Sequence, residues 1–479
     1  MNRIGFVAIA SLVSTAFFAP PPQGGDLARR VAAAADGIVK MTYAAREGVC
    51  GDGRSFVAEG PIGARGFDVW FTDGNSFSTM SGDIGAKCLN GPARVVLVVR
   101  DHRVVDVQPF VGPSSAASSR SGTDLGTVAV AEVARYMLDL ATRGREETAR
   151  NAMLAASIAD SVRIAQPLAG IARNKTLASA VRETALKWVG RAAVREGDRE
   201  ATRVARTILD DRDDQLDVRE RAVRVVGEES DGPAYLRSAY ARVTESTLRE
   251  RIVRVVGESG TRADLDWIRN VALDGAERTA IRERAVRTLG EASDAKALRE
   301  LYDRLDDATL RERIVRVMAE VGDNDSRRWL RDLVERKSES STVRERAIRS
   351  LAELGDIAYL QSSYRSVDDE GLRERILRSV AEGGGSDTKK WLGDIARDTK
   401  EQTSLRERAV RSLAESGVAT SELVTLYDGI ADRTVRERLV NVLAERGDRA
   451  ARDKLRAIAE NDADEDLRRR AVRKLAESR

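Results

Sequence analysis

The sequence predicts a mainly α-helical solenoid preceded by a small β-rich domain. Three observations lead to this prediction. A segment built around Arg-Glu-Arg recurs at intervals of about thirty residues through the later part of the chain. Aromatic residues make up only 4% of the 479 residues and charged residues 33%, a composition that suits thin helical layers held by Ala, Val, Leu and Ile. Alternation of apolar and polar residues, typical of strands, begins near Ile38 and stops well before the repeats.

The first residues have the pattern of an export signal. Met1-Asn2-Arg3 precedes an apolar run from Ile4 to Ala19, and three prolines follow. The sequence therefore predicts a signal peptide over 1–22 and a periplasmic or secreted protein. An uncleaved membrane anchor is the alternative, although the run is short for a membrane span. No other stretch is apolar enough to cross a bilayer.

Residues 38–112 are expected to form the β-rich domain. The stretches 38–43 and 67–71 alternate as strands do, and Gly-containing turns follow them. Two Val-rich runs, 94–100 and 103–110, are separated by Asp101-His102, which indicates a hairpin. The two cysteines of the chain, Cys50 and Cys88, flank part of this region. In an oxidising compartment such a pair predicts a disulfide that holds the domain together.

The segments on either side of this domain lack its pattern. Residues 23–36 are small and polar and are expected to be a mobile lead-in, and residues 113–122 are expected to be a linker. Thr123 or Asp124 is expected to cap a first helix through 129–134. The helical array is thus predicted to span 123–479.

Internal repetition is the strongest feature of the sequence. An eleven-residue motif begins at 218, 248, 281, 310, 343, 372, 405 and 435, for example as LRERIVRVMAE at 310, with a final version at 467 and a weaker one at 181. Shorter and longer units alternate, so two units form a super-repeat. Each unit is expected to contain a helix A, a turn, and a helix B that carries the motif. Motif positions are numbered 1 to 11 from its first residue.

The aromatic residues follow the super-repeat. The tryptophans lie fourteen residues before the long-unit motifs, and the tyrosines lie eight residues before the short-unit motifs; they are Trp267, Trp329, Trp391, Tyr240, Tyr302, Tyr364 and Tyr427. One interpretation is a ladder that stacks on a ligand. The other is a set of core residues that fill the space between helices, and the match to the packing period favours it.

On a helical wheel the motif has two faces. Positions 1, 5, 8 or 9 and partly 6 form an apolar stripe, and position 10 is always Gly or Ala, which would let helices approach closely. Positions 3, 7 and 11 lie opposite and read Glu, Arg, Glu, with favourable i,i+4 spacing. A solvated helix face would suffice to explain them, but stacking would align them into one polar stripe. The residues predicted to bind a partner there are Arg254, Arg287, Arg316, Arg349, Arg378, Arg411, Glu312, Glu345, Glu374 and Glu407.

The ends of helix B are also predictable. Glycines after the motif are expected to stop it, at Gly260, Gly322, Gly355, Gly417 and Gly447. An acid six residues before the position-4 arginine of the short units and of the last unit is expected to cap helix B and to accept a hydrogen bond from an arginine of the same or the next layer. These acids are Glu245, Asp307, Asp369, Asp432 and Asp464.

The motif resembles the HEAT-repeat family, in the short variety also seen in phycobilin-lyase-like proteins. The matching pattern is (V/L)-R-x-x-A-(V/I)-x-x-L-(A/G)-E-x-G, as at 343–355 and 405–417, and the resemblance extends from about 181 to the end of the sequence. It implies a right-handed α-α superhelix whose B helices line a concave, partner-binding surface. A bilin-handling role is not implied, because the repeats contain neither cysteine nor histidine.

The sequence argues against catalysis, metal binding and cofactor binding. The one histidine, His102, lies in the predicted turn, so neither a zinc site nor a nucleophile–His–acid arrangement can be assembled around the repeats. Catalytic residues should break the repeat, because one site needs one set of groups. The main break is Asn441, which replaces arginine at position 7. It marks either a special contact or drift, and drift is the favoured interpretation.

Three functions remain in competition. The first is a monomeric, periplasmic or secreted scaffold that binds an extended charged peptide or protein by matched charges. The second is an enzyme or ligand-binding protein whose acids Asp52, Asp68 and Asp73 lie in the β domain, with the array as holder. The third is nucleic-acid binding by the arginines. A balance of 80 basic and 77 acidic residues and the export signal oppose it.

Overall fold

The computed structural model describes residues 27–53, 56–59, 67–71, 77–80, 88–112 and 121–477. The predicted signal peptide and residues 113–120 of the predicted linker lie outside these ranges. The chain divides into two compact units, Met1–Gly232 and Pro233–Arg479.

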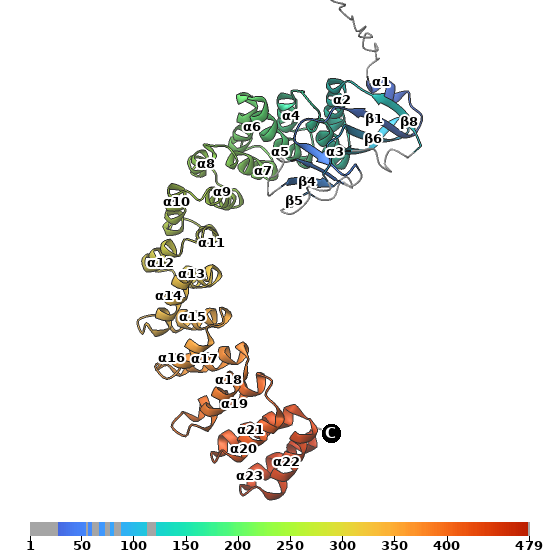
Figure 1. Ribbon diagram of the computed structural model, residues 1–479. Coiled ribbons are helices and arrows are strands. Elements are labelled where there is room, and N and C mark those ends of the chain that lie inside the picture. The colour runs from blue at the N-terminus through green and yellow to red at the C-terminus, as the bar shows by residue number, and fades with distance from the viewer. Residues whose placement is uncertain are drawn as a thin grey trace, which may run out of the picture. The chain divides into compact units, whose positions relative to one another are not determined.

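The first unit contains two four-stranded sheets (Figure 1). The order of the first is β7-β6-β1-β8, made of β1 (Gly37–Tyr43), β6 (Ala93–Arg100), β7 (Arg103–Val111) and β8 (Thr123–Thr127). The order of the second is β2-β3-β4-β5, made of β2 (Val49–Gly51), β3 (Phe56–Glu59), β4 (Phe67–Phe71) and β5 (Phe77–Met80). All neighbouring strands are antiparallel except β1 and β8, which are parallel.

The predicted strands and the predicted hairpin are confirmed. β1 buries Val39, Met41 and Tyr43 at alternate positions, as a strand with one face in the core does. Asp101 and His102 have φ values of 49° and 54°, which suit a tight two-residue turn between β6 and β7. The carboxylate of Asp36 accepts hydrogen bonds from the backbone N–H groups of both turn residues, at 2.7 and 3.1 Å.

Two short elements differ from the prediction. Helix α1 (Leu27–Ala32) lies where a mobile lead-in was expected, because Leu27 and Val31 are buried and anchor it. Residues 123–127 form β8 rather than the start of a helix. Asp124 accepts a hydrogen bond from the N–H of Gly126 within the strand, at 2.8 Å, instead of capping a helix.

Helices complete the first unit. They are α2 (Val130–Arg143), α3 (Glu146–Ser157), α4 (Ala165–Arg173), α5 (Ser179–Glu196), α6 (Arg199–Asp210) and α7 (Leu216–Gly227). Helix α3 packs against β7, and the hydroxyl of Tyr43 in β1 donates to the carbonyl of Ala155 in α3, at 2.7 Å. The sheet and the first helices therefore share one core.

Alternating A and B helices form the second unit (Figure 1). The A helices are α8 (Gly232–Tyr240), α10 (Arg262–Leu273), α12 (Ala295–Arg304), α14 (Asn324–Glu335), α16 (Ile357–Ser363), α18 (Ser386–Arg397), α20 (Thr420–Asp428) and α22 (Arg449–Asn461). The B helices are α9 (Ser246–Glu258), α11 (Thr279–Glu291), α13 (Ala308–Val321), α15 (Ser341–Glu353), α17 (Glu370–Gly383), α19 (Thr403–Glu415), α21 (Arg433–Arg446) and α23 (Glu465–Glu477). Each B helix contacts the next B helix in order.

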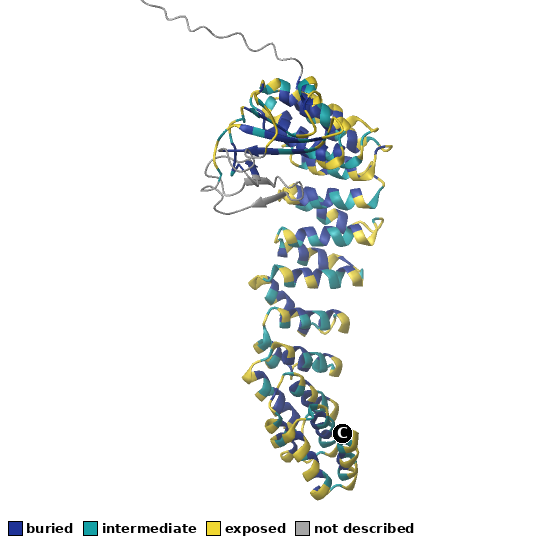
Figure 2. Ribbon diagram, turned by 90° about the vertical axis from the view of Figure 1, so that its right-hand side faces the viewer, coloured by how far each residue is buried: buried dark blue, intermediate teal, exposed yellow. Residues whose placement is uncertain are grey.

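The packing of this array follows the motif. Figure 2 shows buried residues where helices face one another and exposed residues at their ends and in the turns. The predicted glycine stops are confirmed, since all five have φ values between 62° and 75°. A Cβ atom on Gly257 would lie 2.0 Å from Thr288 Cγ2, and one on Gly290 would lie 2.1 Å from Val317 Cγ1. At these two position-10 glycines, neighbouring B helices approach as closely as predicted.

Candidate partner-binding surface

Ion pairs join neighbouring B helices. The position-4 arginine of one motif pairs with the position-3 glutamate of the motif before it. The pairs are Arg313–Glu283, Arg375–Glu345 (3.3 Å), Arg408–Glu374 (2.6 Å), Arg438–Glu407 (3.3 Å) and Arg470–Glu437 (2.7 Å). Three of the four predicted partner-binding glutamates are therefore already engaged inside the array.

The predicted i,i+4 chains along each helix are present only in part. Arg378 pairs with Glu374 at 3.1 Å, and Arg254 pairs with Glu258 at 3.7 Å. Within the described part of the chain, Glu312 and four position-7 arginines make no ion pair. These arginines are Arg287, Arg316, Arg349 and Arg411. Because Glu283, Glu345 and Glu407 pair with the next layer, Arg287, Arg349 and Arg411 keep their donors.

The unpaired arginines remain accessible. Arg316 and Arg411 are exposed, and Arg287 and Arg349 are half-buried. A guanidinium group carries five N–H donors in a planar fork that fits a carboxylate. The B helices thus present a row of position-7 arginines from α11 to α19, unpaired with any described residue in α11, α13, α15 and α19 and paired with Glu374 in α17. We call positions 3, 7 and 11 of motifs 248 to 435 the B-helix surface.

The position-2 arginine, which the sequence analysis did not single out, builds a repeated cluster in the short units. The guanidinium carbon of Arg311 lies 4.2 Å from the ring centre of Tyr302. Arg311 also pairs with Glu339 at 3.1 Å, and the Tyr302 hydroxyl donates to the same carboxylate at 2.9 Å. Trp329 meets Tyr302 edge to face, with ring centres 5.1 Å apart.

Similar clusters recur along the array, although the Tyr364 hydroxyl makes no hydrogen bond to a described residue. Its other copies are Tyr240 with Arg249, Glu277 and Trp267; Tyr364 with Arg373, Glu401 and Trp391; and Tyr427 with Arg436 and Asp462. All four tyrosines are buried, and burial raises the pKa of each phenol above its ordinary value. The interpretation of these tyrosines as core residues is confirmed. An acid four residues before the motifs at 281, 343 and 405, and five before the motif at 467, is the sequence signal that could have revealed the cluster.

In the long units the position-2 arginine does something different. Its Nε donates to the carbonyl ten residues earlier, at the end of helix A. The bonds are Arg282 to Ala272 (3.0 Å), Arg344 to Val334 (2.9 Å) and Arg406 to Ala396 (3.1 Å), with Arg182 to Ala172 (2.8 Å) and Arg219 to Leu209 (3.2 Å) in the first unit. This arginine therefore fixes helix B to its own helix A.

Four of the five predicted capping acids cap helix B. Asp307, Asp369, Asp432 and Asp464 accept from the N–H of the first motif residue, at 2.9 to 3.2 Å. Glu245 does not, and this prediction was wrong: its longer side chain instead accepts from the N–H of Thr244, at 3.2 Å.

Arginines of the preceding layer, rather than of the same or the next one, reach three capping acids. Two of them stand at motif position 2, and the third is Arg433, 3.5 Å from Asp464. Arg282 contacts Asp307 at 3.4 Å, and Arg406 contacts Asp432 at 3.3 Å. The position-4 arginine, around which the prediction was made, is held by the interlayer glutamates instead.

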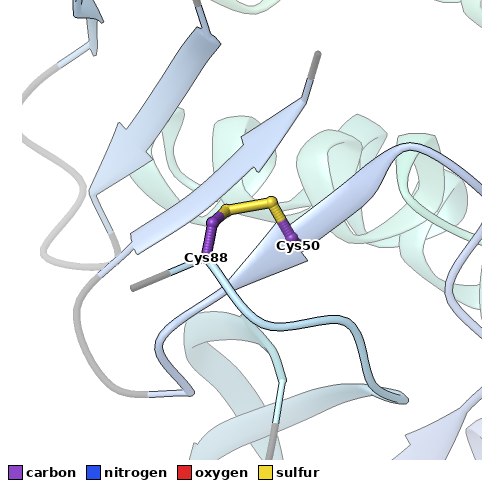
Figure 3. The surroundings of a disulfide bond; sticks show 2 residues. All are labelled: Cys50 and Cys88. Carbon is purple, nitrogen blue, oxygen red and sulfur yellow. A yellow bond between two sulfur atoms is a disulfide. The ribbon is translucent and has the colours of Figure 1, made fainter. Parts of the chain in front are cut away.

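The structure describes the three acids of the enzymatic alternative only in part. Asp52 is half-buried just after β2, Asp68 lies in β4, and Asp73 lies outside the described residues. Cys50 and Cys88 form a disulfide with Cα atoms 5.2 Å apart, as the sequence predicts (Figure 3). In the described ranges, no three His, Cys, Asp or Glu side chains gather as a metal site would require. None of the described helices is long and apolar enough to cross a membrane.

Comparison with known families agrees with this architecture. The family model for HEAT repeats matches residues 300–381, a span that runs from α12 into α17. The helix pairs on both sides carry the same motif and the same interlayer contacts. Residues 300–381 therefore belong to the HEAT-repeat family, and the flanking helix pairs share their motif. Its resemblance to phycobilin-lyase-like proteins stays a prediction.

Several solved structures are similar in part. Human deoxyhypusine hydroxylase is 14% identical, and the match covers 59% of this chain and 98% of that chain with a TM-score of 0.22. Yeast importin-β (Kap95p) matches with 12% identity, 73% of this chain, 58% of that chain and a TM-score of 0.33. The UNC-45 chaperone matches with 12% identity, 74% of this chain, 46% of that chain and a TM-score of 0.24. The chain spans about half the length of the last two. No curated protein matches it.

Proposed function

We propose that the chain is a non-catalytic scaffold that binds a protein or peptide partner along the B-helix surface. One observation carries the proposal. The position-7 arginines Arg287, Arg316, Arg349 and Arg411 have no acidic partner among the described residues, although position-4 arginines beside them do. Interlayer pairs hold the position-3 glutamates Glu283, Glu345 and Glu407 and leave the neighbouring position-7 guanidinium groups available.

The repetition of this arrangement favours an extended partner. The same donors recur in successive layers, and stacked repeats present such groups at regular intervals along one surface. A peptide with regularly placed acceptors would meet several of them at once. Matched charges of this kind contribute specificity and association rate more than raw affinity.

We also propose that the protein acts as a monomer outside the cytoplasm. The pattern of residues 1–22 predicts export. The Cys50–Cys88 disulfide supports export, because disulfides persist in oxidising compartments.

Charge reversal on the B-helix surface tests the proposal. The variant Arg316→Glu/Arg349→Glu/Arg378→Glu should lose its partner. It replaces the guanidinium donors of three successive layers by carboxylates, which repel the acidic groups of the partner. Cross-linked capture from the cell envelope, followed by mass spectrometry, measures the loss.

A matched control reverses three exposed cations on A helices, in the variant Lys296→Glu/Arg328→Glu/Arg449→Glu. Their side chains are 80%, 72% and 94% exposed. The control should capture the same partner as the unmodified protein. Equal recovery of that partner by both triple variants would refute the proposed surface.

A further inference from the structure

Two departures from the repeat line one cavity. The cavity has a volume of about 560 Å³ and lies between α21 and α23. Asn441 replaces the arginine of position 7, and Lys474 stands at position 8, where motifs 218 to 435 have Val, Thr or Ser. Both side chains line the cavity. Random drift would not be expected to place both substitutions at the same cavity.

The shortened side chain at 441 leaves an unsatisfied group at the cavity. Asn441 Oδ1 is buried and accepts no hydrogen bond. A buried acceptor without a donor costs about 1–3 kcal/mol. Rotation of the Asn441 amide toward the cavity would let a peptide N–H group supply the missing donor, whereas a simple anion would not.

The cations around the cavity have donors to spare. Arg438 and Arg470 each use one edge of the guanidinium group, toward Glu407 and Glu437. Arg473 is exposed and makes no ion pair with any residue that the structure describes. Its planar fork is therefore open to a carboxylate, which arginine binds through two parallel hydrogen bonds.

Charge alone does not select the kind of anion. Glu445 and Glu477 line the cavity beside four cations, and Lys474 donates to Glu477 at 2.7 Å. The planar fork of Arg473 and the unsatisfied acceptor of Asn441 favour an acidic peptide, which offers both a carboxylate and a main-chain N–H, over a phosphate, which offers no such donor.

We propose that this cavity binds an acidic side chain of a peptide segment, with its carboxylate on Arg473 and a main-chain N–H donating to Asn441. The cavity residues occupy motif positions 4, 7, 8, 10 and 11 of the last two B helices, so the segment would continue from the B-helix surface. The inference rests on the proposed function to that extent. It assigns the C-terminal end of the array as the place where an acidic residue of the partner is recognised.

Fluorescence anisotropy with the full-length protein tests this inference. The probe is a fluorescein-labelled octapeptide of alternating Glu and Gly, and its matched control has Gln in place of Glu. Arg473→Ala should weaken binding of the Glu peptide at least tenfold. Arg328→Ala, which removes an exposed arginine of α14, should leave it unchanged.

The variant Asn441→Arg separates a shaped site from general attraction. It restores the residue that other motifs have at position 7, so the helix should fold, and thermal unfolding would verify this. It fills the cavity while adding a positive charge, and we expect at least tenfold weaker binding. Equal or tighter binding by Asn441→Arg, or equal binding of the Gln peptide, would overturn the inference. Displacement of the peptide by inorganic phosphate but not by acetate would overturn the choice of a carboxylate.

Failure here is distinguishable from failure of the proposed function. If the partner is captured through the arginines of the B-helix surface but the Glu peptide does not bind, the cavity assignment alone is wrong. If the peptide binds as expected while the triple charge reversal leaves capture unchanged, the B-helix surface is wrong.

Discussion

The position-2 arginine shows how one residue type serves two structural roles. In the long units its guanidinium Nε satisfies a carbonyl at the end of helix A, as Arg344 does for Val334. In the short units it lies over a tyrosine ring and pairs with the acid that the tyrosine also contacts, as Arg311 does. Arginine suits both, because its planar group stacks on rings and donates in several directions.

The most buried of these arginines gives a prediction for stability. Arg182 and Asp214 form an ion pair at 2.5 Å with side-chain exposures of 0% and 2%. Replacing Arg182 by Met should lower the free energy of unfolding of the first unit by about 3–5 kcal/mol, because the Asp214 carboxylate stays buried without its partner. Chemical denaturation would measure it. Lys175→Met, which breaks the exposed pair with Asp211, is the control and should cost less than about 1 kcal/mol.

The same pair predicts how stability depends on pH. Desolvation alone would raise the pKa of Asp214, but hydrogen bonds from Arg182 and the Gln215 N–H outweigh it and lower that pKa below its ordinary value of 3.8. A carboxyl with a lowered folded-state pKa stabilises the fold above its unfolded-state pKa and loses this contribution as the pH falls through the folded-state value. Asp214→Asn should therefore lose less stability than the wild type when the pH drops from 5 to 2. Unfolding titrations at both pH values check this, and equal losses would contradict it.

At the scale of single elements, adjacent B helices are held by close approach and by interlayer pairs. The close approach could be predicted, because position 10 is always Gly or Ala and lies beside the apolar stripe. The partner of Glu345 could not. A wheel drawn for one helix places Arg349 beside it, whereas the structure pairs it with Arg375 of the next motif. The pattern of one helix contains no information on which layer a long side chain reaches.

Two other elements show where local pattern fails. Thr123-Asp124 has the composition of a helix cap, but the backbone of these residues pairs with β1 in a parallel arrangement. Leu27 and Val31 anchor α1 within a stretch of small residues. In both cases contacts distant in sequence decide the structure, whereas the repeats depend on contacts with a neighbour of the same sequence. This is why the array was predictable and the start of the chain was less so.

The close approach predicts the outcome of a small substitution. Gly257→Ala should destabilise the second unit by about 1–3 kcal/mol, because the new methyl group would overlap Thr288 Cγ2, and a β-branched side chain has few alternative rotamers. Gly393→Ala in α18 is the control: its Cβ would lie 3.2 Å from Arg397 Nη1, the end of a flexible side chain. Thermal unfolding of both variants makes the comparison. Equal midpoints would contradict the close packing at Gly257.

On the scale of the whole molecule, the two compact units are stabilised by different means. The first combines sheets, helices and the Cys50–Cys88 disulfide, whereas the second relies on stacked helix pairs. In stacked repeats stability is a sum over units and their neighbours. Loss of a local contact should therefore destabilise mainly the compact unit that contains it.

Removal of the disulfide tests this division. The variant Cys50→Ser/Cys88→Ser opens a loop with a sequence separation of 38 residues, which should cost the first unit about 2–4 kcal/mol. Hydrogen exchange would show the loss of protection in β1 and β6 and unchanged protection in α13 to α21. Loss of protection in both sets of elements would show that the chain unfolds as one cooperative block.

The alternation of arginine roles also restricts how such a chain can change its length. If the helix pair α14 and α15 were deleted, Tyr302 would lose both Trp329 and Glu339, and Arg311 would lose its carboxylate. Deletion or duplication of two consecutive pairs would restore every one of these contacts at the new junction. The array can therefore grow or shrink without disruption only in even steps, and its genetic unit of insertion is the doublet rather than the single helical hairpin.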